Sequence, residues 1–189
     1  MNNIEYLKKQ VSLMINLFQA KKFDSVIDRG RVLIRKFPDQ PIFYNVISLA
    51  YNAIGKSTEA KKLLTKLLKE DSENISVLNN LGLTCMECGE DQEAEEYYNR
   101  ALKLKPDFID ALVNLGNLKT SQNKAEEAKD FFLRALQIDG KIIPANISLA
   151  GYYEQSGKFE EAKKIYKEIL KTNPNYTIAD KSLSLIHKY

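Results

Sequence analysis

Cysteine and histidine side chains are the ones most able to do chemistry at neutral pH, and this chain of 189 residues has two cysteines and one histidine. Cys85 and Cys88 form a lone C-x-x-C pair, whereas a structural zinc site needs four ligands. A redox pair normally lies at a helix N-terminus, but this pair falls near the end of a predicted helix. His187 has no evident partner for a nucleophile–base triad. We therefore predict a core position for Cys85, no catalytic residue, no metal or cofactor, and no enzyme activity.

A different kind of chemistry is indicated by asparagines that recur at a constant interval. A 34-residue interval separates Asn45 from Asn79 and also Asn80 from Asn114, a series that Ser148 continues. A carboxamide has both a carbonyl acceptor and an NH2 donor, so it can pair with a peptide group in both senses. Side chains of this kind on one surface are able to bind an extended main chain.

The same interval organises the rest of the chain. Pro38, Pro106 and Pro174 close three similar segments and are spaced by twice this interval. Self-similarity at a fixed period is typical of repeat architectures. We predict five helix-turn-helix repeats, at 7–40, 41–74, 75–108, 109–142 and 143–176, and a capping or partial sixth-repeat helix at 177–189.

Each repeat has similar residue types at the same places. The seventh place holds large apolar residues. Mostly small side chains, such as Gly82 and Gly116, occupy the eighth, where the two helices of a hairpin are expected to cross closely, although the first repeat has Met14 there. The turn holds Gly or Asn, as a left-handed backbone requires, except that the first repeat has Lys21 there. Gly30 stands where a large side chain is usual in the second helix. We expect the residues after the repeat-ending prolines to cap the first helices, namely Asp39, Asp107 and Asn175.

These features resemble the tetratricopeptide repeat (TPR) family, which is built from 34-residue helix-turn-helix units. The resemblance covers residues 7–176 and extends to the last helix. It implies an all-α fold, a right-handed α-solenoid of five TPR repeats plus a C-terminal capping helix, in a single domain over 1–189. The chain departs from the family pattern in having no Trp and in having Gly140 in place of a terminal proline.

In this family the first helix of each repeat lines the concave face, which such solenoids use for binding. The second, fifth, sixth, ninth, twelfth and thirteenth places of each repeat are the ones that face inward. They hold six of the 15 asparagines of the chain and only four charged residues. The predicted groove is therefore rich in amides, partly apolar and faintly acidic. The predicted peptide-binding residues are Asn45, Leu49, Asn52, Asn79, Asn80, Leu83, Asn114, Asn117 and Ser148.

The asparagine series also resembles the asparagine ladder in the TPR superhelix of O-GlcNAc transferases, and residues 104–117 are similar to the repeats of those enzymes. This resemblance implies that an extended peptide runs along the groove. The chaperone-binding type of TPR domain instead grips a terminal carboxylate with Lys, Asn and Arg. The matching places here hold Val11, Ile15, Val46, Ser76 and Asn80, so that ligand is not expected.

Two functions stay open at the level of sequence. The first is an adaptor or scaffold that docks an extended segment of a client protein. The second is the substrate-recognition segment of a larger glycosyltransferase or sulfotransferase, since similar repeats precede such domains. Weak self-association through the ends of the solenoid is a third possibility, because uncapped ends tend to stick.

Charge and hydropathy limit the other partners. The net charge is only +3, from 28 basic and 25 acidic side chains, so we expect no nucleic-acid partner. No apolar stretch approaches the roughly 20 residues that span a bilayer, so we expect no membrane. Two cysteines so close together do not staple a fold, which suits a reducing, cytoplasmic location.

Overall fold

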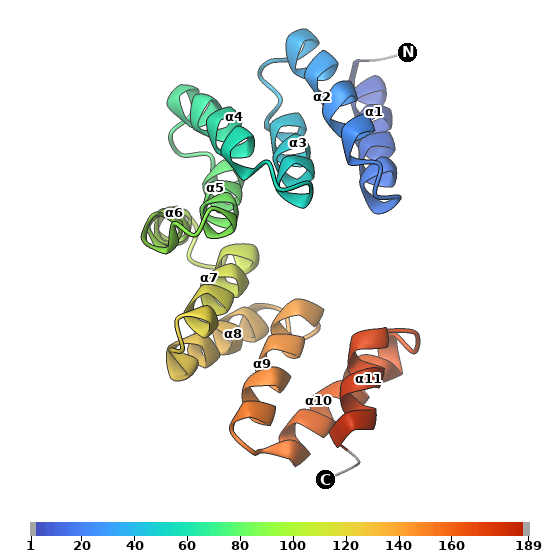
Figure 1. Ribbon diagram of the computed structural model, residues 1–189, viewed down its shortest axis with the longest axis vertical. Coiled ribbons are helices and arrows are strands. Elements are labelled where there is room, and N and C mark those ends of the chain that lie inside the picture. The colour runs from blue at the N-terminus through green and yellow to red at the C-terminus, as the bar shows by residue number, and fades with distance from the viewer. Residues whose placement is uncertain (1–2, 187–189) are drawn as a thin grey trace. The chain divides into compact units, whose positions relative to one another are not determined.

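The computed structural model describes residues 3–186, which form eleven α-helices and no β-strand (Figure 1). The second helices of the hairpins, from α2 to α10, start at a constant 34-residue interval, and the first helices from α3 onward do the same. The predicted all-α fold and its period are confirmed. The helices are α1 (Asn3–Gln19), α2 (Phe23–Lys36), α3 (Pro41–Ala53), α4 (Ser57–Glu70), α5 (Ile75–Glu87), α6 (Asp91–Leu104), α7 (Ile109–Ser121), α8 (Ala125–Ile138), α9 (Ile143–Gln155), α10 (Phe159–Thr172) and α11 (Thr177–Ile186).

The helices group into two compact units, Met1–Pro106 and Asp107–Tyr189. Within each unit, consecutive helices pack against one another as hairpins (Figure 1). First helices of neighbouring hairpins are also in contact, as α1 and α5 each are with α3 and as α7 is with α9. A single domain that runs through all five repeats stays a prediction.

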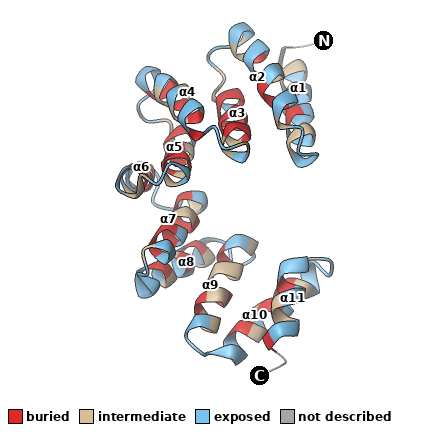
Figure 2. Cartoon of the chain, viewed as in Figure 1, coloured by how far each residue is buried: buried red, intermediate tan, exposed pale blue. Residues whose placement is uncertain are grey.

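The apolar column at the seventh place of the repeats contributes to the core of each unit. Ile47, Leu81, Leu115 and Leu149 are at most 5% exposed. Removing apolar area from water stabilises a fold by about 25 cal/mol per Å². The burial is concentrated on the first helices α3, α5 and α7 (Figure 2). Leu13, in the same column, is 37% exposed, because the described residues place no hairpin before α1.

Glycine is required where the helices of the third and fourth hairpins cross. A Cβ atom on Gly82 would lie 2.5 Å from Cε1 of Tyr98, and one on Gly116 would lie 2.4 Å from Cε1 of Phe132. Real Cβ atoms do not approach other atoms so closely, so the rings pack against bare backbone. The small residues at the eighth place therefore make room for the large residues at the twenty-fourth.

The turns inside the hairpins share one backbone conformation. All five turn residues have positive φ, and Lys21, at 56°, adopts it despite its side chain. The residue after the turn donates its N–H back to the first helix each time, as in Lys56 N to Tyr51 O at 2.8 Å and Glu90 N to Cys85 O at 2.8 Å. This is the hydrogen bond of a Schellman helix end. The turn residues are Lys21, Gly55, Gly89, Asn123 and Gly157.

The predicted N-caps are wrong. The residues at the N-cap positions of α3 and α7 are Gln40 and Phe108, so Asp39 and Asp107 each lie one residue too early. Asn175 likewise lies two residues before the start of α11. The proline of the repeat fixes the end of the second helix rather than the start of the next first helix. Asn74 does cap α5, where its Oδ1 accepts from Val77 N at 3.2 Å.

Gly157 and Gly151 provide a test of the turn. A Cβ atom added at either residue would meet no heavy atom within 4 Å, but only Gly157 has positive φ, at 70°. Gly157→Ala is expected to lower the free energy of unfolding by about 1 kcal/mol through backbone strain. Gly151→Ala, inside α9, is expected to raise it by about 0.5–1 kcal/mol. Urea unfolding followed by circular dichroism measures both, and effects of the same sign would contradict the strained turn.

Candidate functional site

A cavity of about 270 Å³ opens between the first helices α7 and α9 of the second unit. Residues three or four apart on a helix share one face, which brings Asn117 and Thr120 together on α7 and Ser148 and Gly151 together on α9. These four residues and Gln155 stand at places that the sequence pattern assigns to the groove. The remaining lining comes from Asn123, Ala125 and Tyr152.

Hydrogen bonds fix the polar groups of this cavity. Ser148 Oγ donates to Asn117 Oδ1 at 3.0 Å, and Thr120 Oγ1 donates to the carbonyl of Gly116 at 3.0 Å. Asn117 therefore keeps an NH2 group for a ligand, and both hydroxyl oxygens keep lone pairs that accept hydrogen bonds. The predicted pair Asn117 and Ser148 is thus brought together directly.

The lining of the cavity carries no charged side chain. At its edge, the hydroxyl of Tyr152 donates to the carboxylate of Glu126, which also pairs with Lys129. The hydrogen bonds from Lys129 and then Tyr152 lower the pKa of Glu126 from its ordinary value. Glu126 is therefore ionised at neutral pH, and its charge is matched locally by Lys129.

In the first unit, the predicted residues divide by burial. Asn80, Leu49 and Leu83 are half-buried on α5 and α3, so part of each side chain meets solvent. Asn45 and Asn79 are only 8% and 7% exposed, and they lie on α3 and α5, which are in contact with each other. These two asparagines offer little surface to a ligand, so they are the least accessible asparagines among the predicted peptide-binding residues.

Asn52 and Asn114 occupy intermediate positions. Asn52 is half-buried and its Nδ2 donates to Thr84 Oγ1 at 3.1 Å, which joins α3 to α5. Its Oδ1 atom is buried without a hydrogen-bond partner among the described residues. Asn114, at the same place of its repeat as Asn80, is half-buried on α7 of the second unit.

Cys85 lies in the only metal-ligand-like cluster found among residues 3–186, together with Glu90 and Glu93, whose ligand atoms lie within 4.8 Å of one another. Lys61 Nζ lies 2.6 Å from Glu90 and 2.9 Å from Glu93, so an ammonium group already pairs with both carboxylates. Burial raises the pKa of the Cys85 thiol to about 12, which disfavours the thiolate that a metal requires. The cluster is best described as an ion pair over a buried thiol. His187 lies outside the described residues.

Lys119 is a buried charge that the sequence reasoning missed. It is 4% exposed and its Nζ lies 3.5 Å from Glu127 Oε2. The same place of the other repeats holds Tyr51, Cys85 and Tyr153, which are buried or half-buried. The buried or half-buried residues at this place of the other repeats could have indicated that Lys119 is buried. A buried lysine needs a carboxylate partner.

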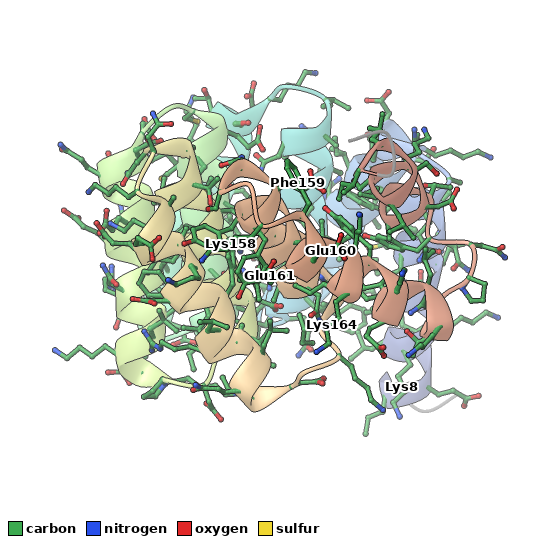
Figure 3. The ribbon with its side chains drawn as sticks, turned by 90° about the horizontal axis from the view of Figure 1, so that it is seen from below. Lys8, Lys158, Phe159, Glu160, Glu161 and Lys164 are labelled. Atoms are coloured by element: carbon green, nitrogen blue, oxygen red, sulfur yellow. The ribbon has the colours of Figure 1, made fainter. Side chains whose placement is uncertain are left out.

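The second helices carry most of the charge. Figure 3 labels Lys158, Glu160 and Lys164 at the start of α10, where these side chains are exposed. Pairs three residues apart neutralise several lysines, as in Lys163 Nζ to Glu160 Oε1 at 2.7 Å. Exposed pairs of this kind contribute little to stability, so their main effect is a solvated surface of mixed sign.

Sequence comparison agrees with this architecture. The model of the middle TPR-like domain of cilia and flagella-associated protein 70 matches residues 44–146, which is more than half of the chain. A tetratricopeptide repeat model matches residues 143–176, the fifth predicted repeat. The chain belongs to the tetratricopeptide repeat family. A search of curated protein sequences finds no match.

Solved structures show the same fold at low sequence identity. A thermophilic TPR protein of Thermus thermophilus superimposes with a TM-score of 0.86 at 13% identity, covering 96% of this chain and 99% of that one. PilF of Pseudomonas aeruginosa gives 0.70 at 19% identity, covering 87% and 75%. A TPR protein of Parabacteroides merdae gives 0.66 at 21% identity, covering 95% and 72%. These likenesses support the TPR solenoid fold alone.

Among the described residues, none of the helices combines the length and the apolar character needed to cross a bilayer.

The two cysteines are expected to differ in reactivity. Cys85 is buried with a pKa of about 12, whereas Cys88 is exposed and its pKa is raised by a smaller desolvation. Because the thiolate is the nucleophile, iodoacetamide at pH 8 should modify Cys88 first and leave Cys85 protonated. Intact-mass spectrometry should show one alkylation in the native protein and two after denaturation. Equal rates at both thiols, judged with Cys88→Ser, would contradict the buried position of Cys85.

Proposed function

We propose that the chain is a protein-interaction module, an adaptor or scaffold, that binds an extended polypeptide segment on its first-helix faces. TPR domains generally are protein-interaction modules, and the fold places a neutral, amide-lined cavity on one of these faces. That cavity is the observation that carries the proposal, because pockets with a few fixed polar groups are where ligands bind.

The groups that remain accessible suit a main chain. Asn80 and Asn114 are half-buried, so part of each residue meets solvent. A carboxamide pairs with both the N–H and the C=O of a peptide. Leu49 on α3 and Leu83 on α5 are half-buried in the first unit and supply apolar contact for side chains.

The proposed partner is a polypeptide rather than a nucleic acid or a membrane. A polypeptide is favoured over nucleic acid or a membrane surface because several lysines of the second helices are matched by glutamates. We propose no catalytic step for the chain. We propose a cytoplasmic location for it. Ile178 and Leu185 of α11 are 51% and 58% exposed, which supports weak self-association through that end.

A substrate-recognition segment of a glycosyltransferase or sulfotransferase would use the same face. This alternative depends on the resemblance of the asparagine series and residues 104–117 to O-GlcNAc transferases. The adaptor and the substrate-recognition segment would both bind a peptide on this face, so a test of peptide binding applies to both functions.

Asn80→Ala combined with Asn114→Ala is expected to weaken peptide binding about tenfold, since each lost amide removes hydrogen bonds of about 0.5–1.5 kcal/mol. Binders are selected from a library of short random peptides, and their affinities are measured by fluorescence anisotropy. N-methylation of alternate backbone amides in a selected peptide should also weaken binding, because it removes donors of the main chain.

Asn99→Ala combined with Asn175→Ala is the matched control, because both asparagines are exposed and lie off the first helices. This variant should bind the selected peptides as the unmodified chain does. Equal binding by the groove variant, or tolerance of N-methylation throughout the peptide, would exclude main-chain recognition by these amides.

A further inference from the structure

We infer that the cavity between α7 and α9 selects one side chain of the bound segment, and that it prefers a carboxamide, Asn or Gln, over a charged or apolar side chain. The inference deepens the proposed function and rests on it. It adds a preference for one side chain of the ligand to a surface that otherwise binds the peptide main chain.

The size of the cavity suits a side chain rather than a free ligand. Its volume of about 270 Å³ lies below the range of about 300–1,000 Å³ in which pockets for drug-sized molecules fall. A single side chain that enters from an extended segment fills such a space. The neighbouring residues of the segment would then remain on the helix faces outside.

The hydrogen-bonding groups of the cavity match a carboxamide. Asn117 has its Oδ1 engaged by Ser148, which leaves its NH2 as a donor toward the cavity. Thr120 donates its hydroxyl proton to the Gly116 carbonyl, so its oxygen acts as an acceptor. The cavity therefore offers a donor and an acceptor on α7, and an Asn or Gln side chain supplies the complementary acceptor and donor.

Charged and apolar side chains are disfavoured for different reasons. A carboxylate or ammonium group would lose water without gaining a counter-charge, because the lining is neutral and Glu126 is already matched by Lys129. An apolar side chain would displace water from the exposed groups of Asn117 and Thr120 without replacing its hydrogen bonds, which loses affinity.

Gly151 gives a way to close the cavity without harming the fold. It lies in the lining, and a Cβ atom there would meet no heavy atom within 4 Å. A leucine at this position would extend into open space, and the loss of a helical glycine favours α9. Gly151→Leu should therefore fold and melt at or above the temperature of the unmodified chain.

The experiment uses capped peptides of the form Ala-Ala-X-Ala-Ala, with X as Asn, Asp or Leu, which are similar in size. Each is titrated into the isotopically labelled chain and followed by NMR at the amides of Gly151 and Gln155 and the side-chain NH2 of Asn117. The Asn peptide is expected to bind about tenfold more tightly than the Asp and Leu peptides. Gln at X should resemble Asn.

Gly151→Leu should remove this preference and bring the Asn peptide down to the affinity of the Leu peptide. Gln137→Leu is the control, because it adds a leucine at an exposed position of α8 outside the cavity. It should leave the preference for Asn unchanged. A circular-dichroism melt of both variants verifies that each is folded.

The outcomes separate the two proposals. If the peptides shift signals along the first helices with equal affinity for all X, main-chain binding stands and the cavity preference is wrong. Tighter binding of the Asp or Leu peptide, or an unchanged preference in Gly151→Leu, also overturns it. If the peptides selected from the random library bind nowhere on the first helices, the proposed function itself is wrong.

Discussion

The contact between the eighth and twenty-fourth residues of each repeat sets the distance between the two helices of a hairpin, and the other features depend on it. In the third and fourth repeats a glycine faces an aromatic ring, Gly82 against Tyr98 and Gly116 against Phe132. In the first repeat the sizes are exchanged. Met14 is fully buried and Gly30 is the small residue, and a Cβ atom on Gly30 would lie 2.3 Å from Ile47 Cγ1 of the next hairpin and 3.0 Å from Met14 Cε. Close-packed interiors tolerate such volume-conserving exchanges.

This contact also decides which side of a first helix is free to bind. The eighth place is buried under the second helix, and the seventh place packs in the core. The ninth and twelfth places, held by Asn117 and Thr120 in the fourth repeat, lie on the other side of the same turns. The repeated Schellman bond keeps each hairpin in the same geometry, so amides at equivalent places of successive repeats keep the same orientation within a unit.

Much of this could be predicted from the sequence, because periodicity is a property of the sequence itself. The repeat interval predicted the helices and the positive-φ turns, and the inward places predicted five residues of the cavity lining, including the hydrogen-bonded pair Asn117 and Ser148. The rest depends on contacts that a column of residues does not contain. Gly30 departs from the repeat pattern, and only the structure shows that Ile47 of the next hairpin and Met14 pack against its bare backbone. The burial of the fifth-place asparagines depends on how closely the neighbouring first helix approaches. The predicted N-cap residues are wrong because an error of one residue in the start of a helix assigns the cap to the wrong side chain.

The separation of charge from the proposed binding face has consequences for recognition. Long-range attraction between a protein and its ligand depends on unbalanced charge, and it speeds association. The cavity lining is neutral, and pairs such as Lys163 with Glu160 balance charge on the second helices. Under the proposed function, a polypeptide partner gains little from electrostatic steering, and its selection depends on contacts at hydrogen-bonding distance. We expect such binding to change little with salt and to strengthen with the number of amides that the segment engages.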